Sequence, residues 1–219
     1  MRYIRKGEEQ KSLTQYKKYW NAYYEGYKNK NDIRENLLKE QGYLCGYCMR
    51  RLSSVNDVKI EHLMPQSTLD EKQALNYKIM IGVCYGNSHI GKDRRREQLT
   101  CDAHRGNKKM VISPFDRNCI DKIEYDATGR IYSKDLDVNK DINETLNLNY
   151  NGEDAYLMIN RRNVLEILKK QLIKYQKQGI WKKSLLKNAL QRYEEPDKEG
   201  KLIPYSGIAI RYLKKKLSG

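Results

Sequence analysis

The sequence lacks any long hydrophobic run. Its longest uninterrupted apolar stretch covers residues 79–84, far short of the ~20 residues that a membrane-spanning helix needs. The basic residues 1–7 also have no apolar run behind them, so they do not resemble a secretory signal peptide. These absences predict a chain that does not cross a membrane and that works in a reducing, cytoplasmic compartment.

Acidic residues are in short supply. The chain has 28 Asp and Glu against 43 Lys and Arg, which gives a net charge of +15. A surface of this kind attracts polyanions, but charge alone leaves open a nucleic acid, an acidic protein and an anionic membrane surface. The lysines expected on the carboxy-terminal helices either bind nucleic acid or only face solvent: Lys169, Lys170, Lys174, Lys177, Lys182, Lys183 and Lys187.

Phenylalanine is almost absent, with one Phe against 18 Tyr. Tyrosines near basic residues can stack on unpaired bases, but a tyrosine can also fill a half-buried position while its hydroxyl stays wet. We favour the second interpretation for the run from Tyr16 to Tyr27. Trp20 and Trp181 are expected to anchor a core or an interface.

The spacing of apolar residues predicts an α+β chain. A short strand is expected at residues 58–60, a β-hairpin within residues 123–132, and helices at residues 13–27, 32–41, 70–83, 102–110, 153–178, 181–193 and after Ser206. This pattern predicts three parts: an amino-terminal helical buttress (1–42), a compact core (43–118), and the hairpin with a helical carboxy-terminal region (119–219).

Five cysteines are the next notable feature, because thiols in a reducing compartment are typical of metal ligands or free thiols. Cys45 and Cys48 form a CxxC pair, which alone is compatible with a redox pair, a zinc knuckle or coincidence. No βαβ pattern supports a thioredoxin-like pair. With Cys84 and Cys101 the set has four thiolates, as a closed structural zinc site requires. The leftover Cys119 is expected to be a small buried hydrophobic residue.

Residues suited to phosphodiester chemistry lie between these cysteines. Glu61 is a hard oxygen ligand that suits Mg²⁺ or Mn²⁺, and His62 can accept a proton at neutral pH. Asp102 and His104 are the candidates for a second metal ligand. A single histidine after a strand is commonly structural. Here, cysteines bracket the Glu61–His62 pair on both sides, so zinc binding would bring this pair and residues 102–104 together.

These motifs resemble those of HNH endonucleases. More narrowly, residues 60–67 (IEHLMPQS) and 101–107 (CDAHRGN) resemble the retron-associated HNH nucleases and PtuB, the nuclease of Septu-type anti-phage systems. The resemblance implies that residues 43–118 form a zinc-stapled ββα-metal core embedded in a mostly helical chain. It also implies a partner ATPase of the PtuA type and a role in antiviral defence.

Carried onto this sequence, the resemblance makes His62 the general base, Glu61 a ligand of the catalytic metal, and Asn76 the residue that braces the base-bearing loop. Asp102 stands where the family usually has Asn or His, so the second metal ligand is either Asp102 or His104. Contacts with nucleic acid are expected from Arg105, from Lys108 and from the basic loop Arg94, Arg95 and Arg96.

The sequence thus predicts a metal-dependent HNH endonuclease that needs structural Zn²⁺ and catalytic Mg²⁺ or Mn²⁺. DNA is the favoured substrate, and an RNA such as tRNA remains open because no residue is recognised as a reader of the 2′-hydroxyl. The alternative is a noncatalytic zinc module that binds nucleic acid or protein. A third possibility is redox signalling through Cys45 and Cys48.

Overall fold

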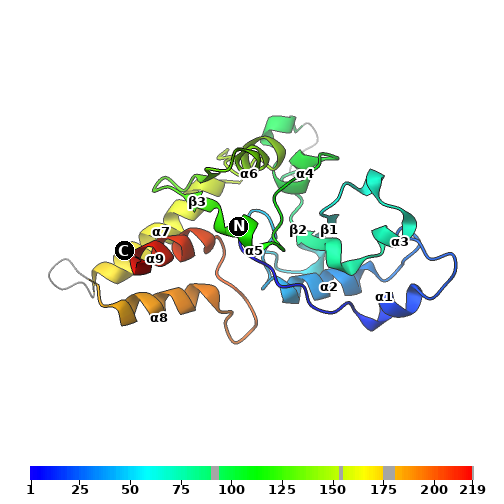
Figure 1. Cartoon of the computed structure of the whole chain (residues 1–219), viewed down its shortest axis with the longest axis horizontal. Helices are drawn as coiled ribbons and strands as arrows, with labels where there is room; N and C mark the ends of the chain where they lie inside the picture. Colours follow the sequence, from blue (N-terminus) through cyan, green and yellow to red (C-terminus); the bar gives the residue numbers. More distant parts are fainter. Residues whose placement is uncertain (90–93, 153–154, 175–180, 219) are drawn as a thin grey trace.

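The computed structural model describes residues 1–89, 94–152, 155–174 and 181–218. Helices and two small antiparallel sheets alternate along this part of the chain, so the fold class is α+β, as predicted. Figure 1 shows the first helices at one end of the molecule and the last three helices at the other, with short elements between them. Among the described residues, no helix combines the length and apolar character needed to cross a membrane.

The first helix is shorter than the sequence predicts. α1 covers Lys11–Tyr16, whereas apolar spacing predicted a helix as far as residue 27. The chain turns back after α1, where the Tyr16 ring packs against Tyr27 with 5.2 Å between centroids and its hydroxyl donates to the Tyr23 carbonyl at 3.1 Å. Contacts among tyrosines therefore replace the expected helical turns.

The second helix follows the prediction closely. α2 covers Lys30–Glu40 and buries Ile33, Leu37 and Leu38. Gly42 has a φ of +59°, a left-handed conformation that ends helices and that glycine adopts without strain.

The first sheet pairs β1 (Lys59–His62) with β2 (Met80–Val83) in antiparallel orientation. The prediction of one helix over residues 70–83 is wrong beyond α3 (Glu71–Ala74). All four residues of β2 are buried, and a short strand that is buried on both faces shows a continuous apolar run that periodicity cannot distinguish from a helix. Short 3-10 turns surround these strands: η1 (Val55–Asp57), η2 (Gln66–Thr68) and η3 (Tyr77–Ile79).

The second sheet confirms the predicted hairpin. β3 (Ile123–Tyr125) pairs with β4 (Ile131–Ser133) in antiparallel orientation. The remaining elements are η4 (Arg96–Gln98), α4 (Cys101–Arg105), α5 (Arg117–Asp121), α6 (Leu136–Lys140), the π-helical turn η5 (Asp141–Thr145), α7 (Leu157–Ile173), α8 (Lys183–Glu194) and α9 (Gly207–Ser218).

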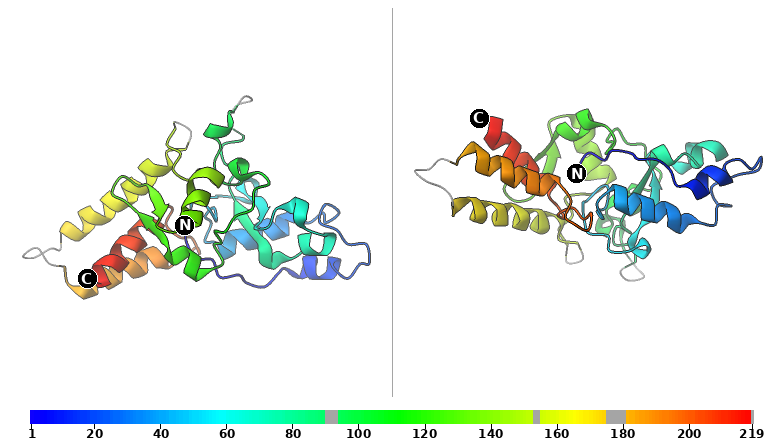
Figure 2. Two further views of the ribbon diagram at one scale, coloured as in Figure 1. Left: turned by 45° about the horizontal axis from the view of Figure 1, so that its top comes forward. Right: turned by 90° about the horizontal axis from the view of Figure 1, so that it is seen from below.

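Three hydrophobic clusters hold these elements together. The central cluster joins the cysteines to apolar residues from Met1 to Leu157, and therefore crosses both predicted boundaries, at residues 42 and 118. A second cluster packs α1 and α2 against residues 74–80. The third lies among α7, α8 and α9, which run side by side in both views of Figure 2. The central cluster contains the candidate metal ligands.

Candidate metal centre and adjoining carboxylates

Four buried cysteines form the candidate metal centre. The sulfur atoms of Cys45, Cys48, Cys84 and Cys101 all lie within 4.8 Å of one another. Three of the separations are 3.9 Å (Cys45–Cys101), 3.8 Å (Cys48–Cys84) and 3.8 Å (Cys84–Cys101). Zinc–sulfur bonds of ~2.3 Å in a tetrahedron place sulfurs about 3.8 Å apart. The cluster could therefore hold a metal ion such as zinc, and its sulfurs are too far apart for the ~2.05 Å bond of a disulfide.

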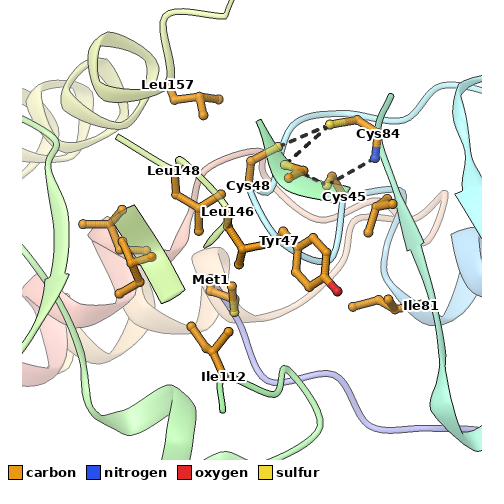
Figure 3. Close-up of a cluster of buried hydrophobic side chains, with 14 of the residues drawn as sticks. Met1, Cys45, Tyr47, Cys48, Ile81, Cys84, Ile112, Leu146, Leu148 and Leu157 are labelled. Atoms are coloured by element: carbon orange, nitrogen blue, oxygen red, sulfur yellow. Dashed lines mark hydrogen bonds between the residues drawn. The ribbon is translucent and has the colours of Figure 1, made fainter. Parts of the chain in front are cut away.

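The chain around the CxxC pair is shaped to present the two thiols. The Cys45 amide donates to the Arg50 carbonyl at 2.9 Å and the Met49 amide to the Cys45 carbonyl at 3.0 Å. The Gly46 amide donates to the Gly82 carbonyl at 3.0 Å, which ties this turn to β2. A Cβ on Gly46 would lie 2.2 Å from the Ile81 Cδ1, so the close approach requires glycine. Figure 3 shows Cys45, Cys48 and Cys84 meeting above Tyr47 and Ile81.

The other two thiols, those of Cys84 and Cys101, come from two further segments of the chain. Cys84 follows β2 directly, and its amide donates to the Cys45 sulfur at 3.3 Å. Cys101 is the first residue of α4, and its amide donates to the Leu146 carbonyl at 2.8 Å. Burial alone would lower the pKa of Arg50, but the negative charge of Cys48 and Cys84 raises it overall. A guanidinium thus partly balances the thiolates.

Cys119 lies apart from this centre, as the sequence predicted. It is 6% exposed and belongs to the central hydrophobic cluster. Its thiol faces the Val111 carbonyl at 3.9 Å.

Two carboxylates meet beside the cysteine cluster. Residues i and i+2 of a strand share a face, and Lys59 and Glu61 of β1 both face α4. The Lys59 Nζ lies 2.5 Å from an Asp102 carboxylate oxygen, and Glu61 pairs with Arg105 of the same helix. Burial, followed by the hydrogen bond and charge of Asp102, raises the pKa of Glu61 to about 8. Lys59 was not predicted to belong to the site. The only sequence signal for it is its position two residues before Glu61, which places both side chains on the same face of a strand.

Arg105 has a different role from the one expected. Its side chain is 1% exposed, and its Nη1 pairs with the Glu61 carboxylate. The guanidinium also donates to the carbonyls of His62 at 2.7 Å, Leu63 at 2.8 Å and Lys108 at 3.0 Å. The expected phosphate contact is therefore wrong for this residue, because the group is buried and its donors are occupied within the protein.

His62 lies on the opposite face of β1 from Glu61. Its Nε2 is 2.8 Å from the Ala74 carbonyl, and its ring stands edge-on to Tyr24 with 4.9 Å between centroids. Donation from Nε2 to the carbonyl fixes the tautomer and leaves Nδ1 as the proton acceptor. Burial lowers the pKa of His62 despite the hydrogen bond to Ala74, which raises it. Tyr24 was expected only to fill a half-buried position.

His104 is oriented toward η5. Its Nδ1 donates to the Thr145 carbonyl at 3.0 Å. Among the described residues, the four cysteines are the only group of three or more potential ligands that could hold one metal ion. Glu61, Asp102 and either histidine do not form such a group. The Nδ1 hydrogen bond of His104 leaves its Nε2 as an acceptor, so the second metal ligand is still either Asp102 or His104.

Asn76 is exposed and stabilises the loop between β1 and β2. Its Oδ1 accepts the Lys78 amide at 3.0 Å and thereby caps η3. Asn76 lies two residues after Ala74, whose carbonyl holds His62. The contact is local, so Asn76 acts on His62 only through the loop.

The other basic residues that are expected to contact nucleic acid flank α4 in the sequence. Arg95 is exposed, as is Arg96, which donates to the His104 carbonyl at 3.4 Å. Lys108 donates to the Glu144 carbonyl at 3.2 Å, and Arg94 is half-buried and engaged in an interaction of its own. Lys177 lies outside the described residues.

A comparison with models of protein families finds no match for this chain, and neither does a comparison with curated proteins. The resemblance to HNH nucleases consequently rests on the motifs of the sequence.

Proposed function

We propose that the protein is a metal-dependent nuclease of the HNH type that hydrolyses phosphodiester bonds. Two ion pairs between β1 and α4, Lys59–Asp102 and Arg105–Glu61, place Glu61 beside Asp102, and this arrangement is the observation that carries the proposal. It brings two oxygen ligands together within a unit made of β1, β2 and α4. Cys84 directly follows β2, Cys101 begins α4, and Cys45 and Cys48 lie in the turn that is hydrogen-bonded to β2. The same unit is what the resemblance implies.

The residues present fit a divalent cation with a preference for oxygen ligands. Two adjoining carboxylates suit Mg²⁺ or Mn²⁺, and a bound cation would neutralise the charge that develops on the phosphate. Lys59 and Arg105 each hold one of these carboxylates. Because both side chains are fixed from the protein side, their oxygens are positioned before any ion arrives.

His62 is proposed as the general base. Its Nε2 hydrogen bond to Ala74 orients the ring and keeps Nδ1 unprotonated at neutral pH, in line with the lowered pKa. An acceptor nitrogen of this kind can take a proton from the attacking water. Because successive side chains of β1 point to opposite faces, the His62 ring and the two carboxylates lie on opposite sides of the strand. The attacking water and the phosphate would therefore bind at the end of β1, next to Leu63.

The net charge of +15 supports a nucleic-acid substrate, with DNA favoured and RNA such as tRNA as the alternative. The partner ATPase and the role in anti-phage defence are supported by the resemblance of the motifs alone. They are included in the proposal for that reason.

The test is cleavage of labelled DNA and RNA with added Mg²⁺ or Mn²⁺. We expect His62→Ala and His62→Gln to lose cleavage while zinc content and the circular dichroism spectrum stay unchanged. The glutamine side chain can still donate to the Ala74 carbonyl but cannot accept a proton at neutral pH. His89→Ala is the matched control, since His89 is exposed and should be dispensable.

The four-cysteine cluster by itself favours a second candidate, a noncatalytic zinc module that binds nucleic acid or protein. That candidate predicts folding that depends on zinc but no product with either metal on either substrate. Full cleavage by both His62 variants would also reject the proposed nuclease site.

A further inference from the structure

Trp20 projects into solvent. It is 94% exposed, and the neighbouring Tyr19 is 65% exposed, so the expectation that Trp20 anchors a core is wrong. The interface alternative for Trp20 stays a prediction. The Trp20 backbone is held in place by hydrogen bonds within the turn. The Tyr19 amide donates to the Tyr16 carbonyl at 3.1 Å and the Ala22 amide to the Tyr19 carbonyl at 3.2 Å. Ala22 packs against the second hydrophobic cluster. A large aromatic surface is thus presented on an ordered turn.

The two rings line a surface pocket of about 460 Å³, within the ~300–1,000 Å³ of small-ligand sites. Lys17 lines this pocket from the same segment of the chain as Trp20, and Lys72, Leu75 and Asn76 line it from the segment around α3. The lining contains two cations and no carboxylate, although the Lys17 ammonium pairs with Glu9 outside the lining. Residues 11–30, which include one side of the lining, contribute further positive charge, because they contain five lysines and one glutamate.

The pocket and the His62 ring share their supporting segments. Ala74, whose carbonyl holds the His62 Nε2, belongs to the segment that lines the pocket through Gln73 and Leu75. Tyr24, whose ring stands against His62, follows Trp20 by four residues. A group bound in the pocket would therefore lie next to the loop that positions the proposed base.

We propose that this pocket binds an unpaired nucleotide of the substrate, with its base stacked on Trp20 and its phosphates near Lys17 and Lys72. Aromatic rings stack on any base that is free of its own stack, and basic side chains beside them track the backbone. A base within a duplex is already stacked on both faces and cannot cover Trp20. The inference deepens the proposed nuclease function by assigning its substrate class as single-stranded nucleic acid or an unpaired loop.

Binding can be measured through Trp20 itself. The chain has two tryptophans, so Trp181→Phe leaves Trp20 as the only fluorophore of its kind. We expect a short oligothymidylate to quench its emission, at fixed salt and without added Mg²⁺. A blunt duplex should compete poorly. Quenching that is absent, or a duplex that competes as well as the single strand, overturns the inference.

Substitution provides the second arm. Trp20→Ala should weaken oligothymidylate binding by about 5- to 150-fold, the loss expected when one stacked base loses its aromatic partner. Trp20→Phe should retain most of the affinity. Leu136→Ala is the surface control, because Leu136 is 84% exposed on α6. An unchanged affinity for Trp20→Ala would mean that Trp20 faces another partner, such as a protein, and would overturn the inference.

The two proposals fail separately. Binding that depends on Trp20 in a protein that cleaves nothing would remove the nuclease and keep the pocket. Cleavage that depends on His62 but is unaffected by Trp20→Ala, together with unchanged binding, would keep the nuclease and remove the pocket.

Discussion

At the scale of single residues, Arg105 joins α4 to β1. Its buried guanidinium pairs with Glu61 and donates to three carbonyls. Removing the guanidinium leaves the Glu61 carboxyl and three carbonyls buried without their donor, which costs ~3–5 kcal/mol. We expect Arg105→Met to lower the free energy of unfolding by about this amount in urea denaturation.

The control for this variant is Arg162→Met. Arg162 is exposed, and among the described residues it forms an ion pair with Glu166 alone, at 3.6 Å. Its effect should stay within ~0.5 kcal/mol. Arg105→Lys should also destabilise the protein, since lysine cannot reproduce the fork of donors. Wild-type stability in Arg105→Met would contradict a structural role and return the residue to the list of nucleic-acid contacts.

The cysteines give a second residue-scale prediction, with a control built into the chain. Cys84→Ala removes one ligand of the cluster, so we expect most of the bound zinc to be lost, as measured by elemental analysis of the purified protein. Cys119→Ala removes a thiol that contacts no other cysteine and should retain wild-type zinc at a cost of about 1 kcal/mol in stability. Equal zinc content in the two variants would rule out the four-cysteine site.

The cluster of four cysteines could be predicted from the sequence because a structural zinc site requires a particular number and kind of ligand, whatever the fold around it. The nearness of Glu61 to Asp102 follows from the same cluster, because cysteines lie on both sides of Glu61 in the sequence and Cys101 directly precedes Asp102. The role of Arg105 could not be predicted, because arginine is rarely fully buried and α4 has too few residues to show a helical period. For Trp20 the sequence left a core and an interface open, because large aromatic residues are usually covered, and only the structure excludes the core.

At the scale of elements, Glu124 of β3 fastens α9 to the second sheet. It pairs with Arg211 and with Lys215, the latter at 2.6 Å. The hydrogen bond from Arg211 holds the pKa of Glu124 down, at about 2. Exposed ion pairs contribute ~0.2–1 kcal/mol each, so Glu124→Gln should lower the free energy of unfolding by about 1 kcal/mol at neutral pH.

The pH dependence of this effect has a definite sign. A depressed folded-state pKa stabilises the protein above the unfolded value of ~4.3, and the contribution is lost as the pH falls toward the folded value. The difference between wild type and Glu124→Gln in urea denaturation should therefore shrink once the pH drops below about 4.3. Glu166→Gln, which removes a longer and more exposed pair, should show a smaller difference. A difference that is constant with pH would contradict the ion-pair explanation.

Elements with a clear local signal could be predicted, and those fixed by distant contacts could not. Gly42 marked the end of α2, and the turn within residues 126–130 marked the second hairpin. β2 was mistaken for helix because all its residues are apolar and its partner strand lies 18 residues earlier in the chain. α1 was made too long because Tyr16, Tyr23 and Tyr27 recur at helical spacing while they pack across a turn.

At the scale of the whole molecule, the metal centre and the carboxy-terminal helices belong to separate cores. The cysteines lie in the central cluster, which takes residues from Met1 to Leu157. The third cluster draws its buried residues from Leu168 to Leu213 and contains none of the ligands. α7 links the two, since it begins in the central cluster and continues into the third. Each core therefore has its own source of stability.

Removal of the metal should distinguish these cores. When zinc is withdrawn by a strong chelator, four buried thiols lose the ion that gathers them, and the free energy of metal binding is lost from folding. We expect amide hydrogen exchange to rise sharply in β1, β2 and α4, while α8 and α9 keep most of their protection because their packing does not involve the cysteines. Cys84→Ala without chelator should reproduce the pattern, and excess zinc should reverse it in the wild type only. Loss of protection in α8 and α9 at the same chelator concentration would mean that the clusters unfold as one cooperative unit.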